Sequence, residues 1–159
     1  MKIMTVRSLA FAAALVAALA TPVLAADVTA RNPEGVRQAL ADLGYAPELT
    51  TGSNGASAIS LTVDGSPSYV DFWNCDDDKT NCETLMLVYG MDLKDGTTAE
   101  QANKWNFDTI HGFVYLDENN DPWLNLTIGT GNGISEELFA TIMRTWRNRI
   151  GDARDFFDL

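Results

Sequence analysis

The sequence contains little of what most enzymes use: one histidine, two cysteines, and half as many basic as acidic residues among its 159 residues. His111 would have to assist any serine or cysteine nucleophile, yet the sequence contains no Gly-x-Ser-x-Gly motif. Nothing singles out two of the 22 acidic residues for a glycosidase, and the predicted sheet offers no cleft. We therefore predict that the protein is not an enzyme and has no catalytic, cofactor-binding or metal-binding residues.

Basic residues are scarce, because 11 Lys and Arg stand against 22 Asp and Glu and give a formal net charge of −11. A surface of this sign repels nucleic acids and anionic membranes, so we expect no nucleic-acid partner. The charge either attracts cationic partners or metal ions at low salt, or serves solubility alone. With 46% hydrophobic residues, the chain is expected to be globular rather than disordered.

The apolar run at residues 9–20 is shorter than the roughly 20 residues that a membrane span needs. Two basic residues precede it and small residues follow it up to Ala25, a pattern typical of a secretory signal peptide. We predict cleavage after Ala25 or one residue later, which gives a signal peptide at 1–25 and one domain at 26–159. An uncleaved anchor is the rival interpretation, but Pro22 interrupts the segment. The mature protein is thus expected to be periplasmic or secreted, without a membrane span.

Residues 33–43 and 135–157 show the spacing of amphipathic helices, and Asn32 and Ser135 are suited to cap them. Apolar residues at three-and-four spacing predict one buried stripe on each helix. The stripe is Val36, Ala39, Leu40 and Leu43 in the first helix, and Leu138, Ile142, Trp146, Ile150, Ala153 and Phe157 in the second. We expect the second helix to be the main cover of the core.

A third, shorter helix is predicted from the capping box between Thr98 and Gln101, and it should end near Phe107. Trp105 lies close to that end and is expected to belong to the core. Asn106 is expected to form hydrogen bonds at the end of the helix.

Strands are predicted where apolar residues alternate between clusters of turn residues. They lie near residues 47–51, 56–63, 68–74, 83–91, 111–116 and 123–126. Short connections favour antiparallel order, and the acidic turn at 117–121 predicts a hairpin. Because residues 85–89 are apolar on both faces, their strand should be central, with cover above and below. The predicted fold is α+β: a single antiparallel sheet of about five to six strands, with an N-terminal helix, a short middle helix and a long C-terminal helix packed on one face.

The two cysteines, Cys75 and Cys82, flank an acidic six-residue loop. After a signal peptide, such a pair most simply forms a disulfide between neighbouring strands. A redox site more often has two intervening residues at the start of a helix, and a zinc site needs further ligands. We therefore predict a structural disulfide.

Two acidic loops have features of calcium sites. The three Asp residues at 76–78 either bind calcium weakly or form a solvated loop. The turn at 117–121 has the one-three-five spacing of a calcium loop, but Pro122 and Ile128 stand where that loop needs Gly and Glu. We interpret both segments as solvated loops and predict no cofactor.

Aromatic residues are expected to gather on one face of the sheet. If alternate residues of the hairpin face the helices, then the opposite face receives Phe113, Tyr115 and Trp123, joined by Tyr69 and Trp73. Such a patch is unusually large for the free surface of a monomer, so we predict that a partner segment or a second copy covers it. The alternatives are a wrong strand parity, or burial of the patch by the first helix.

Three short motifs resemble the YbjN family of bacterial proteins, whose members are described only as candidate regulators of sensory transduction. They are Trp105-Asn106, Tyr115-Leu116-Asp117-Glu118, and the further Asp at position 121. The resemblance extends from Asn32 onward. Relatives often have Gly in the acidic turn where this chain has Asn119-Asn120, and Asn also accepts left-handed backbone angles. The family is similar in fold to type III secretion chaperones, which implies a small α/β domain that pairs and holds extended client segments.

Together these observations predict an exported, non-enzymatic binding or regulatory module, with a chaperone-like role as its narrower form. Its partner would be a protein segment or a second copy, bound through the aromatic face. The alternative is an acidic calcium-binding or hydrolytic periplasmic protein that uses the Asp residues at 76–78 or the Asp117 turn.

Overall fold

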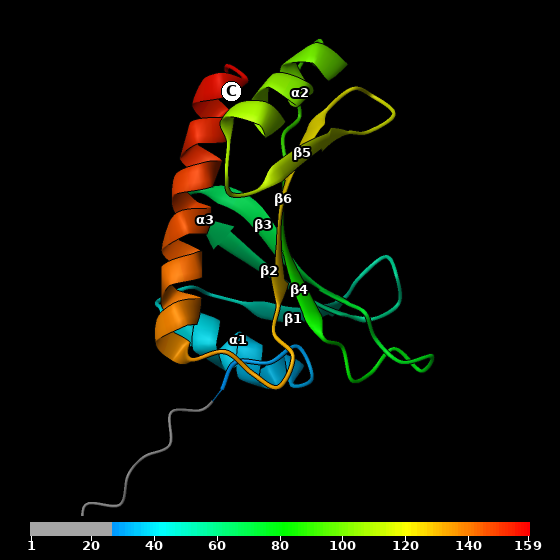
Figure 1. Cartoon of the computed structure of the whole chain (residues 1–159), viewed down its shortest axis with the longest axis vertical. Helices are drawn as coiled ribbons and strands as arrows, with labels where there is room; N and C mark the ends of the chain where they lie inside the picture. The colour runs from blue at the N-terminus through cyan, green and yellow to red at the C-terminus, as the bar shows by residue number, and fades with distance from the viewer. Residues whose placement is uncertain (1–26) are drawn as a thin grey trace, which may run out of the picture.

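The computed structural model describes residues 27–159, which form a six-stranded sheet and three helices (Figure 1). The helices are α1 (Pro33–Asp42), α2 (Ala99–Asp108) and α3 (Glu136–Phe156). The strands are β1 (Glu48–Thr51), β2 (Ser57–Val63), β3 (Ser66–Trp73), β4 (Thr84–Gly90), β5 (Phe113–Leu116) and β6 (Pro122–Gly129). The predicted α+β fold is confirmed, whereas the predicted signal peptide at 1–25 lies outside the described residues.

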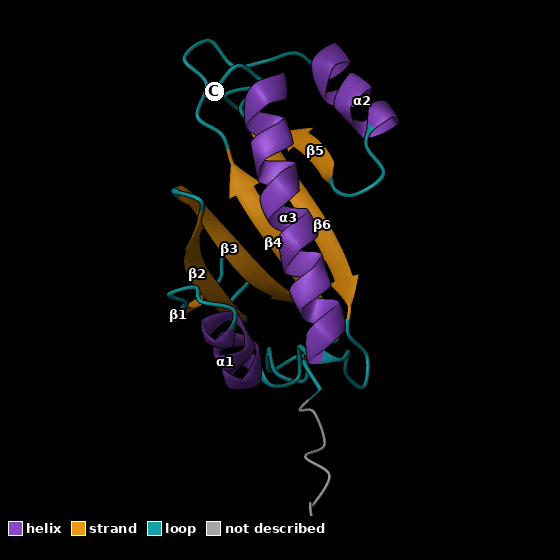
Figure 2. Ribbon diagram, turned by 90° about the vertical axis from the view of Figure 1, so that its left-hand side faces the viewer, coloured by secondary structure: helices purple, strands orange, loops and turns teal. Residues whose placement is uncertain are grey.

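The strands follow the order β1-β2-β3-β4-β6-β5, and each neighbouring pair is antiparallel (Figure 2). The first four strands are joined as consecutive hairpins. The β5–β6 hairpin places β6 beside β4, so β4 is central, as predicted. The hairpin turns through Asn120, whose φ of 61° is the left-handed conformation that Asn tolerates in place of Gly.

Helices α1 and α3 lie against the same face of the sheet (Figures 1 and 2). Asn32 caps α1 by accepting a hydrogen bond from the backbone N–H of Gly35, and Ser135 caps α3 in the same way. Between this face and the helices lies the core, whose largest fully buried side chains include Leu40, Ile59, Phe72, Phe139 and Trp146. The prediction that Leu43 belongs to the buried stripe of α1 is wrong. Leu43 is 40% exposed, because it follows the last residue of the helix.

The buried stripe of α3 begins on a different row from the predicted one. Phe139 and Met143 are buried, whereas Leu138 is 48% exposed and Ile142 is partly buried. The prediction for Leu138 and Ile142 is therefore wrong. Two adjacent rows are apolar in this half of the helix, and spacing alone does not tell which of them faces the sheet.

The predicted cover on both sides of β4 is also wrong, because helices cover one face and, within residues 27–159, no second layer lies over the other (Figure 1). Val88 points to that uncovered face, yet it is 5% exposed. Its cross-strand neighbours are Tyr69 on β3 and Asn125 on β6. Larger side chains around Val88 therefore shield it from water in place of a packed layer.

A disulfide joins Cys75 to Cys82 across the loop between β3 and β4. Inside the loop, the backbone N–H of Asp76 donates to the carbonyl oxygen of Thr80 at 2.9 Å. A crosslink of this span reduces the conformational entropy of the unfolded chain. By the loop-entropy relation, this raises the free energy of the unfolded state by about 2 to 3 kcal/mol. The disulfide thus stabilises the hairpin that supplies two strands of the sheet.

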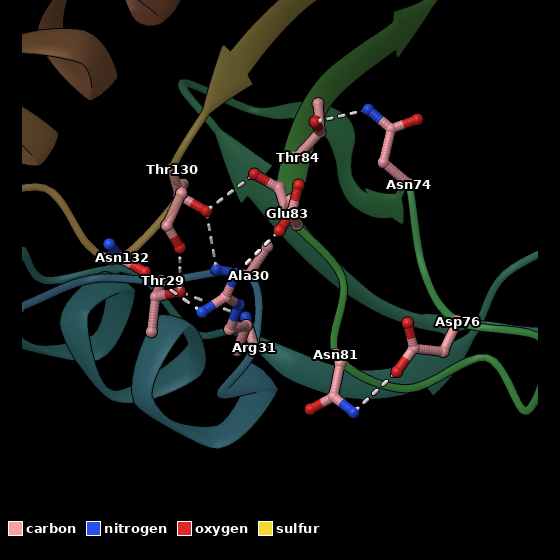
Figure 3. A network of polar contacts seen from close by, with 11 residues as sticks. Thr29, Ala30, Arg31, Asn74, Asp76, Asn81, Glu83, Thr84, Thr130 and Asn132 are labelled. Atoms are coloured by element: carbon pink, nitrogen blue, oxygen red, sulfur yellow. Dashed lines mark hydrogen bonds and ion pairs between the residues drawn. The ribbon is translucent and has the colours of Figure 1, made fainter.

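The segment before α1 is held by polar contacts to the start of β4 and to the loop after β6 (Figure 3). The buried hydroxyl of Thr130 connects them, because it accepts from the N–H of Ala30 at 3.0 Å and donates to the carbonyl oxygen of Glu83 at 3.0 Å. Arg31 adds an ion pair of 2.7 Å with the Glu83 carboxylate. These contacts fix the segment at the end of the molecule away from α2 (Figure 1).

Candidate protein-binding face

The sheet face that the helices leave uncovered is here called the open face. It is formed by alternate residues of all six strands, and the register carries one row from Tyr69 through Val88 and Asn125 to Phe113. A second row joins Gly90, Trp123 and Tyr115. Because side chains alternate strictly along a strand, the register alone puts these side chains on one surface.

The aromatic residues predicted for partner binding all lie on this open face. Tyr69, Trp73, Phe113 and Tyr115 are between 41% and 47% exposed, and Trp123 is partly buried. Four of the five share the two rows described above. Trp73 is set apart, because it lies four residues from Tyr69 along β3 with Asp71 between them. None of the three helices of the described chain covers the group, α1 included (Figure 1).

Trp123 is the anchored member of the group. Its ring stacks on that of Tyr115, with centroids 6.4 Å apart and planes 10° from parallel. Its indole Nε1–H donates to the Asp117 carboxylate at 3.1 Å. The hairpin turn and the neighbouring strand therefore fix the ring before any partner binds, which lowers the entropy cost of binding.

A cleft of about 200 Å³ lies on the open face between Tyr69 and Trp123. Gly90 on β4 lies between them and carries no side chain. A Cβ atom at position 90 would come within 2.9 Å of the Trp123 ring, closer than ordinary contact. The φ of Gly90 is not left-handed, so close packing rather than backbone strain requires glycine here.

We expect the Gly90→Ala variant to lose about 1 to 2 kcal/mol of unfolding free energy, because the added methyl group overpacks against an anchored ring. Chemical denaturation followed by tryptophan fluorescence measures the loss. Gly129→Ala is the matched control, since Gly129 ends β6 on the same open face and a Cβ there meets no atom within 4 Å. Equal losses in the two variants would contradict the role of Trp123.

Acidic groups on the open face differ in the direction in which their pKa is shifted. Burial raises the pKa of Asp71, whose carboxylate forms no hydrogen bond or ion pair within residues 27–159. Hydrogen bonds from the Asp121 backbone N–H, and then from the Trp123 indole, lower the pKa of Asp117. Burial, followed by the negative charges of Asp117 and Asp71, raises the pKa of Tyr115. At neutral pH the lowered pKa keeps Asp117 ionised, and the raised pKa keeps the Tyr115 phenol neutral.

In the two acidic loops with features of calcium sites, carboxylates accept hydrogen bonds from groups of the same loop. Asp76 accepts from the Asn81 side chain at 2.8 Å, and Asp78 accepts from the Thr80 hydroxyl at 2.8 Å. Asp117 accepts from the N–H groups of Asn119 and Asp121. Among the residues that the structure describes, no set of three or more His, Cys, Asp or Glu side chains could hold a metal ion.

A second hollow, of about 310 Å³, lies between β6 and α3, on the other side of the sheet from the aromatic group. The exposed row of α3 contributes to it, as does the single histidine. Its lining consists of His111, Leu126, Thr127, Ile128, Leu138, Thr141, Ile142 and Thr145. His111 itself is exposed. The prediction that it begins the strand is wrong, because β5 starts two residues later.

The cleft residues Pro67, Gly90 and Asp92 were not among the predicted site residues. One signal in the sequence points to Gly90. It ends a strand that otherwise carries bulky apolar residues, and a glycine in that context often marks a close approach of another group. The group that approaches it, Trp123, is identified by strand register, which the sequence does not give.

Comparisons with known proteins agree with this architecture. The sequence model of the YbjN family, described as "Putative bacterial sensory transduction regulator", matches residues 32–159. The solved structure of YbjN from E. coli, described as "a putative transcription regulator", is similar with a TM-score of 0.51 and 19% identity. That match covers 76% of this chain and 85% of the other, and it supports the fold. No curated protein matches the chain.

Within residues 27–159, the structure contains no helix that is both long and apolar enough to cross a membrane.

Proposed function

The chain belongs to the YbjN family of bacterial regulators, and from this premise we propose that it is a non-enzymatic regulatory module that binds protein through its open face. The bound partner is an extended protein segment or a second copy of the chain. Export to the periplasm or beyond is part of the proposal and depends on the signal-peptide pattern at 1–25. Holding an extended segment would make the module chaperone-like.

The observation that carries the proposal is a six-stranded sheet with one face left without helices. Aromatic side chains with 41% to 47% exposure stand on that face beside a fixed tryptophan. Exposed apolar patches of this kind mark interaction sites, and aromatic residues supply much of the binding energy at protein interfaces. A partner that covers these rings would remove from water the largest apolar groups that the sheet exposes.

The test compares the mature chain with the Phe113→Ser/Tyr115→Ser double variant. Light scattering over a range of concentrations measures self-association, and peptides selected from a displayed random library report segment binding. Because buried aromatic anchors each contribute on the order of 2 kcal/mol, we expect the double variant to bind its partner at least about 10-fold more weakly. Circular dichroism and thermal unfolding verify that the variant remains folded.

Leu49→Ser/Leu138→Ser is the control, because these leucines are 47% and 48% exposed but do not point to the open face. We expect the control variant to bind like the wild type. If self-association and segment binding survive in Phe113→Ser/Tyr115→Ser, or if the control variant loses them equally, the open face is not the binding surface. The same holds if the wild type shows neither activity.

A further inference from the structure

The cleft between Tyr69 and Trp123 combines flat aromatic walls with an acidic rim. Its lining is Pro67, Tyr69, Gly90, Met91, Asp92, Asp117, Asp121 and Trp123, and its volume is about 200 Å³. The two rings come from β3 and β6, and the Trp123 ring packs directly on Gly90, which has no side chain. The cleft is therefore aromatic on two sides.

Three carboxylates surround this space. Asp117 is held in place by hydrogen bonds from two backbone N–H groups and from the Trp123 indole. Asp121 accepts from the backbone N–H of Leu93 at 2.9 Å, and Asp92 is exposed. Among residues 27–159, no Lys or Arg forms an ion pair with any of the three. The rim thus carries negative charge that the described part of the chain does not neutralise.

Aromatic faces attract cations through their quadrupole, and carboxylates attract them by charge. A planar guanidinium suits both features, because it stacks on a ring and at the same time donates to carboxylates in two directions. A lysine ammonium is a compact and strongly hydrated charge that loses more solvation in such a cleft. A neutral or acidic side chain would gain no attraction from the rim.

We propose that this cleft binds an arginine side chain of the protein segment that docks on the open face. The inference depends on the proposed function and adds the chemistry of its partner: a segment with an arginine among apolar residues. The apolar residues would contact Phe113 and Tyr115, while the guanidinium enters between Tyr69 and Trp123. The negative net charge of the whole chain would also speed the approach of such a segment at low salt.

The indole N–H of Trp123 provides a direct readout, because it lies at the cleft and donates to Asp117. Its signal in a nitrogen–proton correlation spectrum is assigned by its disappearance in Trp123→Phe. The probe is N-acetyl-arginine methylamide, and its neutral counterpart of similar shape is N-acetyl-citrulline methylamide. We expect the arginine probe to shift the signal saturably and more weakly at high salt, and the citrulline probe to leave it in place.

Two variants locate the binding. Tyr69→Leu removes one aromatic wall, and Asp92→Asn removes a rim charge from a side chain that forms no hydrogen bond within the described chain. Each variant should bind the arginine probe about 2- to 5-fold more weakly, the change in affinity expected for the loss of one exposed cation–aromatic or charge contact. Asp77→Asn removes one negative charge as well, but in the disulfide loop, and should leave the affinity for the arginine probe unchanged.

The assignment to arginine is overturned if the citrulline or the corresponding lysine probe binds as tightly, or if Asp92→Asn behaves like Asp77→Asn. A different outcome is that the arginine probe leaves the Trp123 indole signal unshifted while self-association or segment binding still requires Phe113 and Tyr115. That outcome contradicts arginine binding in the cleft but leaves the proposed function intact. Loss of the proposed function itself shows in the Phe113→Ser/Tyr115→Ser experiment, which uses no residue of the cleft.

Discussion

We expect the Trp105→Ala variant to lose about 3 to 5 kcal/mol of unfolding free energy, the range for removing a large buried aromatic side chain. Trp105 is 3% exposed and packs its ring edge-on against Phe156, with centroids 5.5 Å apart, and against Phe157 at 6.0 Å. These contacts join α2 to the end of α3. Their loss would leave a cavity and free α2 from the rest of the core.

Phe107→Ala is the matched control, because it removes an aromatic ring from the same helix at a position that is 90% exposed. We expect it to change stability by less than about 0.5 kcal/mol. Denaturant unfolding of both variants gives the comparison. Trp105→Phe should retain much of the stability, since the indole nitrogen of Trp105 has no hydrogen-bond partner among residues 27–159. A loss below about 1 kcal/mol in Trp105→Ala would show that α2 contributes little to the core.

The second large effect is expected for Asn106→Ala. The side chain of Asn106 pairs with the backbone of Val114 on β5, since its Nδ2 donates to the carbonyl oxygen at 3.0 Å and its Oδ1 accepts from the N–H at 2.7 Å. Because β5 is an edge strand, the Asn106 side chain thus makes the two backbone hydrogen bonds that a neighbouring strand would otherwise make with Val114. Removing two hydrogen bonds from a buried valine should lower the unfolding free energy by about 2 to 3 kcal/mol.

Asn103→Ala serves as the control, because Asn103 is exposed on the same helix and forms no side-chain hydrogen bond within the described chain. We also expect Asn106→Ala to self-associate through the freed edge of β5, because unpaired strand edges recruit other strands. Thermal unfolding measures the first effect and light scattering the second. An Asn106→Ala variant as stable as Asn103→Ala would contradict the pairing with Val114.

Much of the open face could be predicted because strand alternation is a local property. Phe113 and Tyr115 are two residues apart on one strand, so they must share a face whatever the rest of the chain does. Trp123 joins them because the acidic turn fixes the hairpin register. The helix caps at Asn32 and Ser135 are local in the same sense, and both form as predicted.

The rest depends on contacts between segments that are distant in the sequence. The cleft exists because β3, β4 and β6 are aligned so that Val88 pairs with Tyr69 and Gly90 pairs with Trp123, and no short pattern encodes that alignment. The rotation of α3 about its axis also depends on contacts with distant segments. Leu138 and Phe139 are both apolar, so the choice between their rows is made by packing against the sheet rather than by spacing.

The pairing role of Asn106 was predicted in part. A hydrogen-bonding residue at the end of α2 follows from helix geometry, but its partner on β5 does not. The carbonyl groups at a helix end need donors, which made the local interpretation reasonable. The structure instead directs the side chain to a strand, because Gly112 and the loop before it bring β5 alongside α2.

The burial of Asn125 determines how the protein should be produced. The side chain is fully buried, and its Nδ2 donates to the carbonyl oxygen of Trp123 at 2.8 Å. The sequence Asn125-Leu126-Thr127 nonetheless fits the acceptor pattern for N-linked glycans. A eukaryotic secretory host attaches such glycans before a chain has folded, and a sugar on that nitrogen could not be accommodated between β4 and β5. Bacterial expression avoids this, whereas a yeast or mammalian secretion host would require replacement of Thr127.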